Sequence, residues 1–293
     1  MDSDRLRDFL LLSPQHVAVL TDYSVMESLK GRTLENIETA WRVLRDFPDQ
    51  IVVLKEAHEA ALVRPQEAEV AQQMICQIET RALSKIPKII ASAKLGNEDS
   101  LDQLRKLGRE VDDHFEQIRA RSSELPLFIK SVEGIFSAGE LKQLRKASEL
   151  NEDMAIKLFN YVVHQTEGLC AQHPDNPPML EPKHLANQFL FRFAVANAAY
   201  LIELVRTGAN RRNPDDARND AVDIINVTFA TYFHGLMTDD RRAGATYELT
   251  RQLLTAYGSE VVDGALDWTR AYPVDIPADF FEILSDGCPR PLP

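Results

Sequence analysis

The sequence is poor in cysteine, and its three cysteines (Cys76, Cys170 and Cys288) are far apart, with no Cys-x-x-Cys spacing. This pattern indicates reduced thiols and argues against a disulfide framework or a structural zinc site. No apolar run approaches the roughly 18 residues of a membrane span, and the acidic N-terminus lacks the positive region of a secretory signal. We therefore expect a cytoplasmic protein with no membrane partner.

Several nucleotide-binding and nucleophile motifs are also missing. The loop after the first apolar run reads TDYSVME and contains no glycine, whereas a dinucleotide-binding fold needs a glycine-rich turn there. The chain has no GxxxxGK[ST] phosphate loop and no GxSxG nucleophile elbow. A Rossmann-type oxidoreductase is therefore the least favoured class, and chemistry based on carboxylates and a divalent metal is left.

Positive charge is in short supply, because the formal net charge is −12 at pH 7. A protein that coats nucleic acid through bulk electrostatics is usually basic, so the charge disfavours that class but not an enzyme with a local basic rim. Arginines do gather around one acidic stretch: Arg206, Arg211, Arg212, Arg218, Arg241 and Arg242. They either contact substrate phosphates or neutralise nearby acids such as Asp215 and Asp216.

The chain does contain a strand–helix–strand pattern near its N-terminus. The apolar runs at 16–20 and 51–54 predict buried parallel strands, and the spacing of apolar residues between 24 and 47 predicts one helix. Helical periodicity dominates residues 65–207, and a helix, an apolar run at 235–237 and another helix follow. We expect an α/β fold whose parallel sheet is built from 1–64 and 208–293, with 65–207 as a large all-helical insertion.

The most informative stretch is 219–242, NDAVDIINVTFATYFHGLMTDDRR, an apolar helix with Asp220 and Asp223 on one side. Residues three apart share a helix face, and an acid on a buried helix needs a partner because an unpaired buried charge is costly. A divalent cation is such a partner when several acids converge. Alternatively, both aspartates lie in the first helical turn, where the helix dipole stabilises negative charge, and this suits Asp220 better than Asp223.

Further acids follow the predicted strands. Asp22 comes directly after the first strand, where sites of parallel α/β sheets form, although an Asp there is also a common turn or capping residue. Glu27 lies close behind it, but Ser24 and Glu27 also match a capping box. Asp240 follows the 235–237 run, and the alternative is that Thr238 caps the next helix with Asp240 in its first turn.

A strand ending in Asp, a helix starting with Asp and a later Thr-x-Asp resemble the PIN domain nuclease family. Asp22 matches the first acid of the family and Asp240 the last, while Asp220 and Asp223 lie 20 and 17 residues before Asp240. The resemblance covers only about 16–30 and 218–245, and the middle acid of the family lies further along the chain than Glu27. It implies a three-layer fold with a parallel sheet, bound Mg²⁺ or Mn²⁺, and hydrolysis of phosphodiester bonds.

The sequence therefore predicts a metal-dependent nuclease, with RNA favoured over DNA on the resemblance alone. The predicted catalytic and metal-binding residues are Asp22, Glu27, Asp220, Asp223 and Asp240. The predicted phosphate contacts are Arg211, Arg212, Arg241 and Arg242. Two alternatives stay open: a non-catalytic regulatory protein on a PIN-like core, with the insertion as a surface for a protein partner or self-association, and a metal-dependent phosphohydrolase of small substrates.

Overall fold

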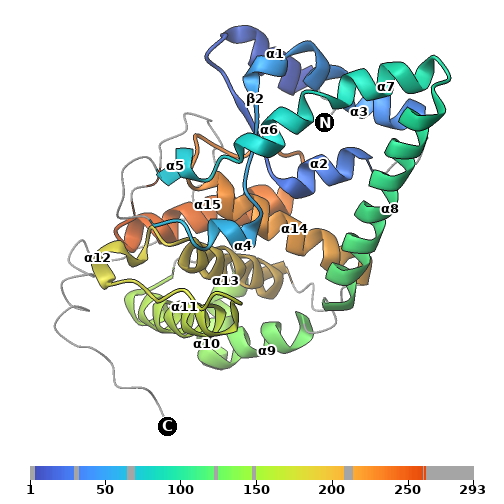
Figure 1. Cartoon of the computed structure of the whole chain (residues 1–293). Coiled ribbons are helices and arrows are strands. Elements are labelled where there is room, and N and C mark those ends of the chain that lie inside the picture. Colours follow the sequence, from blue (N-terminus) through green and yellow to red (C-terminus); the bar gives the residue numbers. More distant parts are fainter. Residues whose placement is uncertain are drawn as a thin grey trace. The chain divides into compact units, whose positions relative to one another are not determined.

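The computed structural model describes residues 4–29, 33–64, 70–121, 125–146, 150–207, 214–259 and 261. The chain divides into two units, the first formed by residues 1–60 and 71–121 and the second by residues 61–70 and 122–293. Helices dominate both units (Figure 1). No described helix combines the length and the apolar character needed to cross a membrane. The predicted division into 1–64, 65–207 and 208–293 stays a prediction.

The first unit holds the strand–helix–strand segment and a following run of helices. Its elements are α1 (Asp4–Leu12), β1 (Ala18–Leu20), α2 (Asp22–Leu29), α3 (Leu34–Asp46), the 3₁₀-helix η1 (Pro48–Gln50), β2 (Ile51–Val53), α4 (Ala57–Ala60), α6 (Gln77–Leu83), α7 (Ile86–Lys94) and α8 (Glu98–Arg121). Helix α5 (Val70–Gln73) begins at the boundary between the two units.

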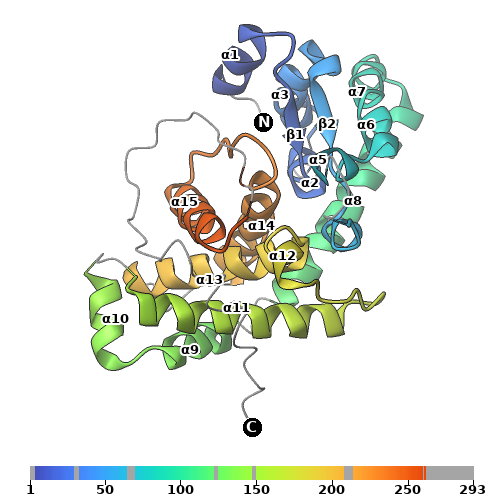
Figure 2. The same cartoon turned by 90° about the vertical axis from the view of Figure 1, so that its left-hand side faces the viewer.

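Strands β1 and β2 pair in parallel, with Ala18 opposite Ile51 and Leu20 opposite Val53. The parallel pair predicted from the two apolar runs is therefore confirmed, and Figure 2 shows the strands side by side. The first and last residue of each strand are buried, so apolar side chains pack on one face of the pair. Both strands point their carboxyl ends toward the same edge, which brings the residues that follow them near each other.

The segment between the strands contains two helices, whereas the sequence predicts one from 24 to 47. Helix α2 ends at Leu29, and α3 begins at Leu34 behind a new N-cap. Thr33 provides this cap, because its hydroxyl accepts the backbone N–H of Asn36. A Thr hydroxyl that accepts a backbone N–H in the first turn favours the start of a new helix over continuation of the preceding one.

The second unit is a helical assembly around one central helix. Its helices are α9 (Leu125–Ile135), α10 (Ala138–Arg145), α11 (Glu152–Gln172), α12 (Pro182–Leu185), α13 (Phe189–Thr207), α14 (Pro214–Ala230) and α15 (Arg241–Ala256). Helix α13 is buried on nearly all sides, as its almost uniformly apolar sequence requires. It lies between α11 on one side and α14 and α15 on the other (Figures 1 and 2).

One buried arginine, Arg192, forms hydrogen bonds with several segments of this unit. Arg192 on α13 is 2% exposed, and its guanidinium lies 3.9 Å from the centre of the Tyr232 ring. Its N–H groups donate to the main-chain oxygens of Ala186 and Thr231 and to the side-chain oxygens of Thr231, Asn187 and Ser259. The arginine therefore joins the start of α13 to the segments that follow α14 and α15.

The predicted three-layer α/β fold is wrong, because the described residues are mostly helical and their strands form a single pair. The apolar run 235–237, predicted as a strand of the same sheet, has no regular secondary structure. Met237 is 40% exposed, whereas a strand inside a parallel sheet is covered on both faces. The apolar faces of α13 and α14 are buried against other helices, and a periodic apolar pattern does not specify whether a helix or a sheet covers it.

Candidate functional site

The carboxyl end of β1 leads directly into α2, so the chain places an acid at the first helical position. The hydroxyl of Thr21 accepts the backbone N–H of Ser24 at 3.2 Å and caps the helix. Helix α2 consequently begins at Asp22, three residues before Val25, where a Ser24–Glu27 capping box would start it. Asp22 is thereby held at the sheet edge where the sequence predicts it.

Asp22 has an unusual environment for a carboxylate. Its Oδ1 atom is buried and has no hydrogen-bond partner. Burial, with a smaller contribution from the negative charge of Glu56, raises the pKa of Asp22 to about 6. Backbone N–H groups of Tyr23 and of Asp22 itself, and the charge of His58, act in the opposite direction but do not cancel the effect of burial. A carboxylate oxygen of this kind is available to a ligand.

Glu56 is a functional candidate that the sequence reasoning missed. It follows β2 in the chain, much as Asp22 follows β1, and its charge acts on Asp22. The imidazole Nδ1 of His58 lies 3.2 Å from the Glu56 carboxylate, and both side chains are exposed. The signal was present in the sequence, because an acid that follows the second of two parallel strands lies at the same sheet edge as an acid that follows the first.

Glu27, the other acid predicted near Asp22, has a different position. It is exposed, five residues after Asp22 on α2. Five residues correspond to a rotation of about 140° around an α-helix, so the two side chains leave α2 on different faces. The structure therefore associates Glu56, and not Glu27, with Asp22.

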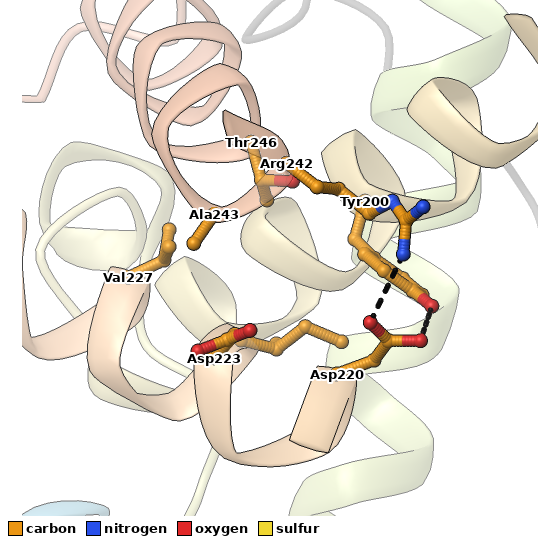
Figure 3. Close-up of a pocket in the computed structure, with 8 residues that line it drawn as sticks. Tyr200, Asp220, Asp223, Val227, Arg242, Ala243 and Thr246 are labelled. Atoms are coloured by element: carbon orange, nitrogen blue, oxygen red, sulfur yellow. Dashed lines mark hydrogen bonds and ion pairs between the residues drawn. The ribbon is translucent and has the colours of Figure 1, made fainter. Parts of the chain in front are cut away.

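In the second unit, Asp220 is buried and contacts two side chains from neighbouring helices (Figure 3). The hydroxyl of Tyr200 on α13 donates to its Oδ2 at 2.5 Å, and Nη1 of Arg242 on α15 lies 3.3 Å from its Oδ1. The helix-face argument predicts that this acid needs a partner, and the structure supplies an arginine and a tyrosine. Both of its oxygens are therefore engaged in holding α14 to α13 and α15.

The neighbourhood of Asp220 contains a second buried ion pair that the sequence reasoning missed. Glu203 is 6% exposed, and Nη1 of Arg206 contacts its carboxylate at 2.8 Å. Burial raises the pKa of Glu203, while the charges of Arg206 and Arg242 act in the opposite direction. Together with Asp220, these groups form a charge-balanced network of two carboxylates and two guanidinium groups.

Asp223 lies beside this network, one turn further along α14. It is half-buried, and Figure 3 shows its carboxylate turned away from that of Asp220. The small pocket lined by Asp220, Asp223, Arg242 and their apolar neighbours does not accommodate a water molecule. This pocket therefore has no room for a hydrated cation or a phosphate.

Asp240 is the N-cap of α15. Its Oδ1 accepts the backbone N–H groups of Arg242 at 2.7 Å and Ala243 at 3.0 Å, while its own N–H donates to the hydroxyl of Thr238. The helix-terminus alternative therefore describes the geometry, with Asp240 rather than Thr238 as the cap. Arg241 is exposed beside it. Two other predicted phosphate contacts, Arg211 and Arg212, lie outside the described residues.

Within the described part of the chain, no three His, Cys, Asp or Glu side chains converge as a metal-binding group. Asp22 belongs to the first unit, and Asp220, Asp223 and Asp240 belong to the second. Comparison of the chain with protein-family models, curated proteins and solved structures finds no match. Function is therefore inferred from the chain's own residues.

Proposed function

We propose that the chain is a cytoplasmic, metal-dependent nuclease whose principal functional carboxylate is Asp22. The observation that supports this proposal is the buried, unpartnered Oδ1 of Asp22 at the carboxyl end of a parallel strand. Leaving a buried polar atom unsatisfied costs about 1–3 kcal/mol, and such exceptions concentrate at functional sites. A carboxylate with a strongly raised pKa at the edge of a parallel sheet fits that description.

The donor chemistry at this edge fits Mg²⁺ or Mn²⁺. Mg²⁺ prefers oxygen ligands, keeps several waters, and is commonly held by one or two carboxylates together with substrate phosphates. Asp22 and Glu56 provide that number of carboxylates, and His58 is placed to orient Glu56 through their 3.2 Å contact. When bound, the cation polarises the phosphodiester and activates water near neutral pH.

Nucleic acid as the substrate, and RNA in preference to DNA, comes from the PIN-like pattern of acids. The shared role predicted for Asp22, Asp220, Asp223 and Asp240 stays a prediction that substitutions test. Asp240 is informative here, because Asn caps helices as well as Asp does. Asp240→Asn therefore tests the predicted metal-ligand role of this carboxylate while it preserves the cap.

The test is cleavage of labelled single-stranded RNA and DNA by the purified chain in Mn²⁺, Mg²⁺ or EDTA. We expect metal-dependent cutting of RNA that disappears in EDTA and in Asp22→Asn, and that falls strongly in Glu56→Gln. Asp49→Asn is the matched control, because Asp49 is an exposed acid in the same unit. Absence of cutting under all metal conditions would overturn the proposal, and cleavage of a small phosphoester alone would identify a phosphohydrolase.

A non-catalytic interaction protein is the second candidate, and one observation favours it. In the second unit, Asp220 is bound by Tyr200 and Arg242 and Asp240 caps a helix, so these acids already have structural roles. If cleavage is absent and the thermal stability of the protein does not respond to Mn²⁺, this candidate replaces the nuclease.

A further inference from the structure

A pocket of about 520 Å³ lies between α2, α3 and α8 in the first unit. Its volume falls within the range of roughly 300–1,000 Å³ that is typical of small-molecule sites. The apolar part of its lining comes from all three helices: Leu29, Leu34, Ile37, Leu101 and Leu104. Ile37 and Leu104 are almost completely buried, so the apolar surface continues into the core of the unit.

The charged part of the lining comes from α8 alone. Arg105 and Arg109 are four residues apart and therefore share a helix face, and Asp112 follows on the same side. Arg105 contacts the exposed Asp102, and Asp112 has an interaction partner of its own. Arg109 is exposed and has no ion pair with any described residue. The pocket thus combines an aliphatic wall with a guanidinium group that is able to bind an anion.

The chemistry of this lining selects among ligands. The described lining residues include no aromatic ring, hydroxyl or amide side chain, so they offer neither a stacking surface nor the mixed donors and acceptors that read a nucleobase. Aliphatic side chains favour an aliphatic body, and Arg109 favours a carboxylate or phosphate at one end. We propose that this pocket binds a small amphipathic anion, an aliphatic chain that carries a terminal acidic group.

Gly108 provides a clean way to close the pocket. It lines the cavity on α8, and a Cβ added there meets only the Leu29 carbonyl oxygen, at 3.8 Å, an ordinary contact. Gly108→Ala is therefore tolerated, whereas the longer side chain of Gly108→Leu extends into the cavity. Both substitutions favour the helix relative to glycine, so neither is expected to unfold α8.

The experiment is isothermal titration of the full-length chain with decanoate, decyl phosphate, decanol and decyltrimethylammonium, below their micelle concentrations. We expect saturable binding of the two anions, with affinity for decanol and the cation at least tenfold lower. Arg109→Glu should weaken decanoate binding at least tenfold. Lys106→Glu makes the same charge change on α8 outside the pocket, and it should change the affinity less than twofold.

Gly108→Leu should abolish binding of both anions, while Gly108→Ala keeps it, with circular dichroism showing the same helix content in each variant. Equal affinity for decanoate and decyltrimethylammonium would overturn the proposal, because charge would then play no part. Unchanged binding in Gly108→Leu would also overturn it, because the ligand would then occupy another place. Neither result depends on whether the chain cleaves nucleic acid.

Discussion

The sign of the stability change in Asp220→Asn distinguishes a structural role of this carboxylate from a role in metal binding. Asp220→Asn preserves the size of the side chain but removes its charge. If the carboxylate serves mainly to bind Arg242 and Tyr200, as its contacts indicate, the variant should be less stable. If it is held among other acids for a metal, removal of its charge relieves repulsion and the metal-free variant should be more stable.

The expected size of the loss follows from the two contacts. The Tyr200 hydroxyl donates to a charged oxygen at 2.5 Å, and replacing a charged acceptor by a neutral one reduces such a bond by about 1 kcal/mol. The ion pair with Arg242, whose side chain is 29% exposed, contributes about 1 kcal/mol after screening by solvent. Together they predict a decrease of about 2 kcal/mol in the free energy of unfolding.

Urea unfolding followed by circular dichroism in EDTA measures this change. A thermodynamic cycle with Arg242→Ala and the double variant should give a coupling energy of about 1 kcal/mol between the two side chains. Arg241→Ala is the matched control. Arg241 is the exposed residue next to Arg242 on α15, and it makes no described contact with Asp220. An Asp220→Asn protein that is as stable as the parent, or more stable, would refute the structural role.

Three further predictions concern stability. Asp22 has a folded-state pKa of about 6 against an ordinary value of 3.8, because burial favours its neutral carboxyl over the carboxylate. The stability that this neutral carboxyl gives the fold is fully present below pH 3.8 and is lost as the pH rises to about 6. Asp22→Asn should therefore raise the unfolding free energy above pH 6 by at most about 3 kcal/mol and leave it unchanged near pH 4, and the opposite order would contradict the burial of Asp22. Arg192→Leu should lower the unfolding free energy by about 3 kcal/mol or more in urea, because five buried or partly buried acceptor contacts lose their donor; a change below 1 kcal/mol would exclude that role. Gly108→Ala should raise the melting temperature, since Ala favours a helix over Gly by about 1 kcal/mol and its Cβ fits, whereas a lower melting temperature would mean that α2 and α8 approach more closely.

The local elements of the first unit were largely predictable from sequence. Two valine-rich runs and the acid after the first run correctly located β1, β2 and Asp22, because short strands and their ends depend on adjacent residues. The extent of the sheet was not predictable in the same way. Whether the 235–237 run pairs with another strand depends on contacts distant in the chain, which a local apolar pattern does not encode.

The partners of the acids were the least predictable feature. The apolar context of Asp220 correctly implied a partner, but Tyr200 lies 20 residues before it and Arg242 lies 22 residues after it, on different helices. No periodic pattern connects these three positions. Glu56, in contrast, was within reach of the sequence argument, because it follows β2 at the edge where Asp22 follows β1.

Binding of Mn²⁺ by the purified chain tests the central claim most directly. Electron paramagnetic resonance counts free Mn²⁺ in a titration of the parent protein, Asp22→Asn, Glu56→Gln and the control Asp49→Asn. We expect saturable binding to the parent and to Asp49→Asn, a loss of at least tenfold in affinity in Glu56→Gln, and no saturable binding in Asp22→Asn. Equal Mn²⁺ affinity in the parent and in Asp22→Asn would contradict the assignment of the buried Asp22 oxygen as a metal ligand.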